Sequence, residues 1–540
     1  MIARTPQPLQ GKAFGAWGFE SIGIRWAAAA AILLGIFMFG VYAYSLQERF
    51  GEGITGMGTI GSGGAAWGIY IVFAVFFIGV SFAGISVSAL IRLFGIEPIR
   101  HISRMAELLT IIALMMGALC IVADLGQPLK GFLYLPQYAR TMSPFFGTFS
   151  MVIGGYLSAS LLYFFLAGRP DAAYMARHVK HFRWVYRLWA SGYRGTLAEQ
   201  ERHHKTSFWL SLMILPLLVT AHSTLGFIFG IQGGRPGWFD ALQAPGFVVM
   251  AGVSGVGVIL VAAALIRHLL HTEDRIGLAT FRWLGNSLLV LTGVYLYFMV
   301  AGEITANYAG IAVEAHISHE IVFGAYAIPF WITVGTLVSA FAILFLQFVT
   351  GKSSIAWTVS AGVLVNVAAV LKRFLIVVPS QIHGTMLPWE PGRYIPNWVE
   401  LSVIAGLFAL GTLMYITFLK FFPIISMEAH AETFPEEAGQ RSNTGFRTIA
   451  MWSTLALGAC LAVAGFLISA RYGTEAYLDP ILPFSPVLFI AGVVLMFGSA
   501  VVYELIPDSP SSLEPERKSE SFPSPGERIP FEIEEPVLTN

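Results

Sequence analysis

Twelve stretches of roughly 20 apolar residues run along this chain, and that is the length an α-helix needs to cross the hydrocarbon core of a bilayer. Hydrophobic residues make up 56% of the sequence and charged residues 12%, so lipid is the solvent for most of it. Within lipid, a helix satisfies every backbone polar group inside its own segment. We therefore expect an all-α polytopic membrane protein of about 12 transmembrane helices. The stretches lie near residues 26–47, 67–91, 105–126, 147–168, 207–231, 245–266, 283–303, 327–349, 354–374, 399–420, 449–470 and 485–504.

Lysine and arginine are unevenly divided between the two sides of the predicted bundle. The loops on the side of the N-terminus hold 21 of them, the loops opposite hold 8, and the C-terminal tail holds the remaining three. Loops that stay in the cytoplasm carry the excess of positive charge, so we expect both termini to be cytoplasmic. The chain as a whole has 32 basic and 32 acidic residues, and so no net field that would attract nucleic acid.

Cysteine and histidine are too few inside the spans for an intrinsic metal centre. Cys120 and Cys460 are the two cysteines of the chain, and each lies in an apolar run. Iron–sulfur and zinc sites need several converging ligands. His222 is the one histidine well inside a span, whereas a membrane b haem usually takes two. We expect no intrinsic haem, iron–sulfur cluster or metal site.

Three ionisable residues fall in the outer half of the predicted spans, where each is costly and therefore a candidate for function. Asp124 ends the third span, His222 lies within the fifth, and Glu303 lies near the end of the seventh. Each has a simpler interpretation: a helix-cap residue, an interhelical hydrogen bond, or a side chain that reaches the membrane surface. Their position on one side favours a shared polar pocket.

Glu107 opens the third span at the opposite face of the membrane. It precedes Asp124 by 17 residues, which is roughly 25 Å along a helix. A pair with nearby Arg104, serving as an anchor, is one interpretation, and a role in proton uptake is the other. The residues alone favour the anchor.

The outer side also carries a segment suited to contact with another protein. Residues 379–398 are rich in proline and aromatic side chains, which favours a fixed, extended path rather than a mobile loop. Two basic residues precede the segment on the side where positive charge is disfavoured, so a buried acid such as Glu303 or Asp124, or an acidic partner, should compensate them. The predicted docking residues are Lys372, Arg373, His383, Trp389, Arg393 and Tyr394.

Several short motifs, taken in order, resemble the NrfD/PsrC family, the membrane subunits of polysulfide-reductase-like complexes. The resemblance is strongest to the ten-helix branch found in alternative complex III and in redox complexes of sulfate reducers and sulfur oxidisers, and it covers roughly residues 20–425. The motifs are Arg104-Met-Ala-Glu107, Asp124-Leu-Gly-Gln-Pro128, Ala221-His-Ser223, Pro236-Gly-Trp238, Pro245-Gly-Phe247, Ser254-Gly255, Lys372-Arg-Phe-Leu-Ile-Val-Val-Pro379 and Tyr394-Ile-Pro-Asn-Trp-Val-Glu400.

This resemblance implies a multi-pass subunit of a bacterial inner (cytoplasmic) membrane complex, surrounded by lipid and not an enzyme on its own. Its substrate would be a quinone, either menaquinone or ubiquinone, bound near the outer face. An iron–sulfur protein would dock on the outer loops, with multihaem cytochrome or molybdopterin subunits beyond it. By motif position, the catalytic residues would be His222 and Asp124, the quinone-binding residues Ser223, Gln127, Trp238 and Glu303, and the proton path would include Glu107.

The mechanism implied is proton-coupled electron transfer, in which a quinol hydroxyl gives its proton to His222 or Asp124 as the electron leaves. Some family members carry other groups near Asp124, which leaves open which residue takes the second proton. Two other classes remain open from the residues: a proton or ion transporter, and a membrane anchor without its own site.

Five segments follow from these patterns. Residues 1–25 are a cytoplasmic N-terminal segment, 26–425 the ten-helix membrane domain, and 426–448 a cytoplasmic loop. Residues 449–504 add two further transmembrane helices, and residues 505–540, rich in Ser, Pro and Glu, are a disordered cytoplasmic tail.

Overall fold

Twelve helices in the described part of the chain are long and apolar enough to cross a membrane, which confirms the all-helical polytopic prediction. The computed structural model describes residues 23–57, 65–138, 150–179, 181–382, 394–425, 440–441, 444–471, 484–506 and 509–510. The spanning helices are α1 Ile24–Phe50, α2 Ile69–Phe94, α3 Ser103–Asp124, α5 Ser150–His178, α7 Leu197–Gly230, α8 Gln243–Leu269, α9 Leu278–Tyr308, α11 Ala327–Thr350, α12 Ile355–Val377, α13 Trp398–Phe421, α14 Thr444–Arg471 and α15 Ser485–Leu505.

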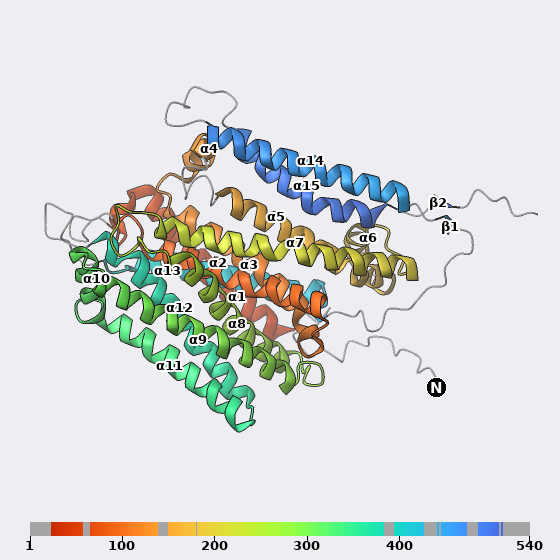
Figure 1. The fold of residues 1–540 in the computed structure, drawn as a ribbon. Helices are drawn as coiled ribbons and strands as arrows, with labels where there is room; N and C mark the ends of the chain where they lie inside the picture. The colour runs from red at the N-terminus through yellow and green to blue at the C-terminus, as the bar shows by residue number, and fades with distance from the viewer. Residues whose placement is uncertain are drawn as a thin grey trace, which may run out of the picture.

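Short elements lie at the two ends of the spanning helices (Figure 1). We call the end that carries α4 (Pro128–Tyr138) and α10 (Ala312–Val322) the outer end, and the end that carries α6 (Arg183–Ala190) the inner end. These three short helices lie between the predicted spans. The remaining elements are the 3-10 turns η2 Glu52–Ile54, η4 Glu97–Ile102 and η6 Pro379–Gln381 and the short antiparallel pair β1 Gln440–Arg441 and β2 Ser509–Pro510.

Local sequence signals account for where several helices begin and end. Thr196 and Glu199 form a capping box at the start of α7, and Asn397 and Glu400 form another at the start of α13. In each box the two side chains accept hydrogen bonds from backbone N–H groups that the first turn leaves unpaired. Gly95 ends α2 in the left-handed conformation, which only glycine adopts without a Cβ penalty.

The spanning helices form two four-helix bundles that share an interface. The first bundle consists of α2, α3, α5 and α7, the second of α8, α9, α11 and α12, and α2 and α7 pack against α8 between them. Burial identifies α2 as the central helix. In its most apolar 18-residue stretch 83% of the residues are buried, whereas the figure is 11% for α1 and for α14. The large core cluster accordingly runs through both bundles rather than filling each one separately.

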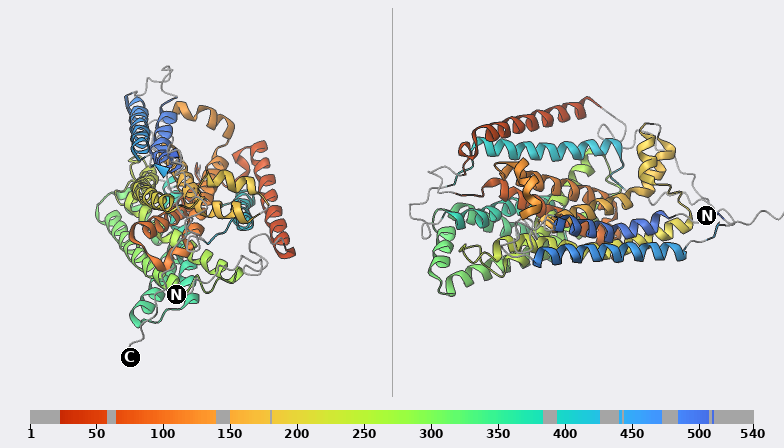
Figure 2. Two further views of the ribbon diagram at one scale, coloured as in Figure 1. Left: turned by 90° about the vertical axis from the view of Figure 1, so that its right-hand side faces the viewer. Right: turned by 90° about the horizontal axis from the view of Figure 1, so that it is seen from above.

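Two helix pairs flank the bundles on different sides (Figure 2). Helices α1 and α13 pair with each other, and α13 packs against α3. Helices α14 and α15, here called the C-terminal hairpin, lie against α5 and α7 through α15. Val493 and Phe497 of α15 join a core cluster with Tyr163 of α5 and Ile214 of α7. The hairpin is therefore an integral part of the inner half of the fold.

Candidate functional site

A cavity of about 460 Å³ opens at the outer end of the second bundle, between α8, α9, α10 and α12. Phe247, Met250, Phe298 and Met299 supply much of its apolar wall. Ligand sites of this kind are mostly apolar with a few polar groups that fix orientation. The polar and charged residues of this outer cavity are Asp240, Gln243, Tyr295, Glu303, Thr305, Glu314, Ser318, Lys372 and Arg373.

Lys372 is a cation of the cavity without a direct partner among the described residues. Its ammonium makes no hydrogen bond or ion pair within those ranges, although it feels the charges of Glu303 and Asp240. Those carboxylates are already engaged: Glu303 Oε2 accepts from Ser318 Oγ at 2.7 Å, and Asp240 Oδ1 accepts from the Leu242 N–H at 2.9 Å. A donor is thus left facing an apolar space, which is the arrangement that recognises a carbonyl oxygen.

Arg373 lines the same cavity but is only 4% exposed. Its Nη1 donates to the Ala369 carbonyl oxygen at 3.0 Å and its Nη2 to Ser254 Oγ at 3.3 Å, while Nε has no partner among the described residues. The guanidinium carbon lies 5.6 Å from the centre of the Phe76 ring. Arg373, one of the predicted docking residues, thus has its charge inside the protein.

The loop before α8 closes one side of the cavity. Trp238 of this loop donates from Nε1 to the Ile376 carbonyl oxygen at 2.6 Å and stacks on Trp67, with ring centres 5.5 Å apart. It stands beside the cavity, between Gly237 and Phe239 of the lining. Glu314 of α10 accepts from the Gly237 N–H at 2.8 Å. Burial raises the pKa of the Glu314 carboxyl, and that hydrogen bond opposes the rise.

His222 lies in the first bundle, fully buried, and joins α7 to α2. Its Nδ1 is 2.8 Å from the Leu218 carbonyl oxygen and its Nε2 is 2.9 Å from that of Ile78. The ring packs edge-on against Phe82, with centres 4.9 Å apart. Both nitrogens are occupied by backbone oxygens, and neither His222 nor Ser223 lines either of the two larger cavities among the described residues. The His222 ring thus connects α7 to α2 through a hydrogen bond between the two helices.

Asp124 belongs to a separate cluster of acids at the outer end of the first bundle. Its Oδ1 is buried without a hydrogen-bond partner among the described residues, and Glu52 and Glu400 are its acidic neighbours. Gln47 Nε2 connects the cluster, donating to Glu52 Oε1 at 2.9 Å and to the Ala123 carbonyl oxygen at 2.8 Å. Burial raises the pKa of the Glu52 carboxyl. Gln127, the next predicted quinone ligand, is exposed.

The predicted docking loop is described only at its end. His383, Trp389 and Arg393 lie outside the described residues. Tyr394 is 4% exposed, and its hydroxyl donates to Glu400 Oε1 at 2.7 Å and accepts from the Ile69 N–H at 2.7 Å. Burial, with the Glu400 charge, raises the Tyr394 pKa. The Tyr394 side chain thus contacts the acid cluster, through Glu400, and is not part of an exposed outer surface.

A second cavity, of about 340 Å³, opens at the inner end of the first bundle and contains Glu107. Glu107 pairs with Arg92 at 3.0 Å and accepts from Ser103 Oγ at 3.2 Å and from Ser88. Its Oε2 is buried without a partner among the described residues. The expected pair with Arg104 is wrong, because Arg104 bonds instead to Asp171 of α5, a residue that comes beside it only in the fold.

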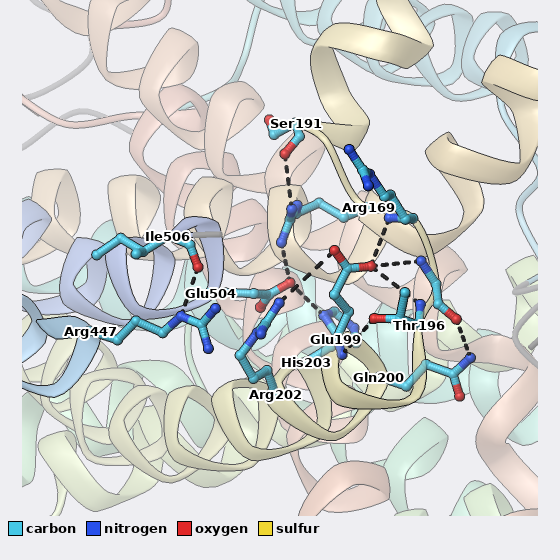
Figure 3. A network of polar contacts seen from close by, with 12 residues as sticks. Arg169, Ser191, Thr196, Glu199, Gln200, Arg202, His203, Arg447, Glu504 and Ile506 are labelled. Carbon is cyan, nitrogen blue, oxygen red and sulfur yellow. Dashed lines mark hydrogen bonds and ion pairs between the residues drawn. The ribbon is translucent and has the colours of Figure 1, made fainter. Parts of the chain in front are cut away.

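The wall of this inner cavity is joined to the C-terminal hairpin by buried charges (Figure 3). Glu504 of α15 pairs with Arg169 of α5, and its Oε1 also accepts from His203 Nδ1 of α7 at 2.9 Å. Arg169 donates further to the carbonyl oxygens of Ala190 and Ser191, both at 3.2 Å. His203 lines the inner cavity. Four segments of the chain thus meet at Glu504.

The sequence predictions missed several polar residues of these sites: Asp240, Tyr295 and Glu314 at the outer cavity, Glu52 and Glu400 in the acid cluster, and Glu504. Glu504 and Tyr295 lie within apolar runs, so the rule that flags polar side chains in spans could have found them. Asp240 and Glu314 lie in outer segments, where acids are ordinary, and only the fold brings them to the cavity.

Comparison with known proteins matches the family model described as polysulphide reductase, NrfD, over residues 60–383. One relative, a dimethyl sulfoxide reductase membrane subunit by name, comes from Halobacterium salinarum and is 28% identical over 75% of this chain and 92% of its own. Another, a selenate reductase subunit of Mesobacillus selenatarsenatis, is 26% identical over 73% of this chain and 94% of its own.

A third relative is the Hdr-like menaquinol oxidoreductase integral membrane subunit of Archaeoglobus fulgidus. It is 24% identical over 77% of this chain and 98% of its own. The family model covers more than half of the chain and includes all of both bundles from α2 to α12. The chain is a polytopic integral membrane protein that belongs to the polysulphide reductase NrfD family.

Proposed function

We propose that this chain is the quinone-interacting membrane subunit of a multi-subunit oxidoreductase complex. The observation that carries the proposal is the outer cavity, with its apolar walls and a Lys372 ammonium that pairs with none of the described residues. A quinone ring is flat and apolar and carries two carbonyl oxygens, so it needs such walls and a hydrogen-bond donor. The name of the Archaeoglobus relative, a menaquinol oxidoreductase subunit, supports this substrate class, and menaquinone or ubiquinone would serve.

The residues of the outer cavity suit the chemistry of a quinol. Oxidation of a quinol removes two electrons and two protons, and reduction of a quinone adds them. Lys372 and the Tyr295 hydroxyl would donate to the ring oxygens, and the Glu303 carboxylate would accept a ring proton. The electrons would pass to an iron–sulfur protein docked at the outer end, with molybdopterin or multihaem cytochrome subunits beyond it.

The first bundle offers a second position for the ring, close to the residues that the sequence predicts. A narrow space of about 10 Å³ lies between Ile121, one turn before Asp124, and Leu225, one turn after His222. The Asp124 Oδ1, unpartnered among the described residues, favours this position, because a buried carboxylate oxygen normally has a donor. The space itself would have to widen to admit a ring. Ser223 and Gln127 would be the further ligands of a ring at this second position.

An azidoquinone photolabel separates the two positions in the purified complex. We expect crosslinked peptides from α8, α9 and α12, with labelling suppressed by excess unlabelled quinone. If the crosslinked peptides come from α3 and α7 instead, the ring binds beside Asp124 and His222. In that case His222→Ala should abolish quinone-dependent turnover while the complex stays intact. No suppressible label at all would favour a membrane anchor or a transporter.

The inner cavity suits proton uptake from the opposite face, with Glu107 as the receiving group. Glu107 stands in a polar, open cavity and keeps one carboxylate oxygen free of partners among the described residues. Glu107→Gln keeps the shape of the side chain and removes its carboxylate. We expect it to lower proton uptake at the inner face by about 100-fold or more, the lower end of the usual contribution of a proton-transfer group, with quinone binding unchanged. A pH-sensitive dye in membrane vesicles measures the uptake, and wild-type uptake in the variant would remove Glu107 from the path.

The orientation, membrane and division of the chain complete the proposal. Both termini would be cytoplasmic in a bacterial inner membrane, which places the outer cavity and α10 on the far side from the cytoplasm. Residues 26–425 would form the ten-helix unit, and the C-terminal hairpin would be an addition to it. A tag at either terminus, tested for protease access in sealed vesicles, checks the orientation.

A further inference from the structure

Two adjacent cations of α12, Lys372 and Arg373, line the outer cavity, and no acid in the described ranges bonds to either. Arg373 is 4% exposed, and the groups that it contacts are neutral: a carbonyl oxygen, the Ser254 hydroxyl and the Phe76 ring. Lys372 likewise makes no ion pair to a described residue. A buried charge without an ionic partner is costly. An anion that binds beside these residues would offset that cost.

The absence of a side chain at Gly79 leaves room for the Arg373 guanidinium. A methyl group at Gly79 of α2 would put its Cβ 2.3 Å from Arg373 Nη2 and 3.4 Å from Ser254 Oγ. The guanidinium therefore occupies a slot that exists because residue 79 has no side chain. This slot fixes the charge at the cavity wall, so the site does not have to reorganise when a ligand becomes charged.

The acids of the cavity form no ion pair with these cations within the described ranges. The charged residues that face the cavity are Asp240 from the loop, Glu303 from α9, Glu314 from α10, and the two cations of α12. Each acid already accepts a hydrogen bond: from the Leu242 N–H, from Ser318 and from the Gly237 N–H. The α12 wall thus keeps two donors with positive charge, while the acids bond to their own side.

We propose that the outer cavity selects the anionic form of its ring, with Arg373 and Lys372 as the selecting residues. This rests on the proposed function and deepens it. When a bound quinol ionises, one O–H bond breaks, the electron pair stays on the ring oxygen beside α12, and the proton passes to the Glu303 carboxylate. The anion gives up electrons more readily than the neutral quinol does, so the cations would promote electron transfer to the iron–sulfur partner.

Two naphthoquinones of nearly equal shape test this with the full chain in nanodiscs at pH 7. 1,4-Naphthoquinone is neutral, and 2-hydroxy-1,4-naphthoquinone is an anion at that pH. We expect calorimetry to show that the wild type binds the anion about tenfold or more tightly, as one hydrogen bond to a charged group supplies. Arg373→Gln should lose this preference and still bind the neutral quinone. Arg235→Gln, which removes a cation over the Trp238 ring at the same end, should keep it.

Further variants keep the test decisive. Gly79→Ala should weaken the preference as Arg373→Gln does, because it closes the slot, and Arg373→Lys should retain part of it. These two variants still test the proposal if the Arg373→Gln protein does not fold. Equal binding of both naphthoquinones by the wild type, or a preference that survives in Arg373→Gln and Gly79→Ala, overturns the proposal and leaves the quinone function standing. Failure of the neutral naphthoquinone to bind would instead contradict the proposed function itself.

Discussion

Gly302→Phe should reduce quinone-linked turnover by about 100-fold or more while the complex stays assembled, since loss of ~3 kcal/mol of ring contacts corresponds to that factor. Gly302 lines the outer cavity, and a Cβ built there meets no atom within 4 Å. A side chain at this position therefore starts into the cavity without a clash at its Cβ, and its ring should occupy the volume that the quinone would need. Turnover with an added quinol in isolated membranes measures the loss, and gel filtration checks assembly.

Gly335→Phe is the matched control. Gly335 lies on α11, away from the cavity lining, and a Cβ there also meets nothing within 4 Å. The same increase in size should leave turnover unchanged. Normal activity in Gly302→Phe would show that the ring binds elsewhere, and the first-bundle position at Asp124 and His222 would become the better one.

Glu504→Leu should lower the free energy of unfolding by about 3–5 kcal/mol, the usual cost of removing one partner from a buried ion pair. Glu504 is 5% exposed, and its carboxylate pairs with both Arg169 and His203. Leucine would leave the Arg169 guanidinium buried without a carboxylate and would remove the polar contact between α15 and the first bundle. Thermal unfolding of the purified protein in detergent, with limited proteolysis of the C-terminal hairpin, measures the effect.

Glu201→Leu provides the comparison on the surface of α7. Glu201 pairs with Lys205 at 2.7 Å, but both side chains are largely exposed, so solvent screens the pair and its loss should change stability little. An unfolding temperature that falls equally in the two variants would mean that burial of Glu504 does not set the cost, and that the hairpin is held by its apolar seam alone.

The sequence alone was enough to predict the fold class, because the twelve apolar runs mark helices one at a time. Position along each helix also follows from those runs: Asp124, Glu303 and Lys372 all lie near the outer ends of their helices. What the runs could not supply is the direction in which each helix faces. Asp124 and Glu303 are at one level but belong to different bundles, so the single predicted pocket divides in two.

Neighbouring positions on one helix show the same limit. The sequence groups Lys372 and Arg373 as docking residues because they are adjacent and basic. In the fold they point about 100° apart around α12, and Arg373 enters the slot at Gly79. Pairs that are distant in sequence, such as Arg104 with Asp171 and Arg169 with Glu504, leave no periodic signal, because each depends on how whole helices pack.

The pair between Arg169 and Glu504 has a consequence for synthesis. The two residues are 335 positions apart, and a ribosome adds roughly 5–20 residues per second. Arg169 is therefore made roughly 17 to 67 s before its partner exists. During that interval the guanidinium at the inner end of α5 lacks the carboxylate that pairs with it in the finished fold. A chain that stops before residue 504 would therefore keep Arg169 without its carboxylate partner, and only the backbone oxygens of Ala190 and Ser191 would accept hydrogen bonds from it.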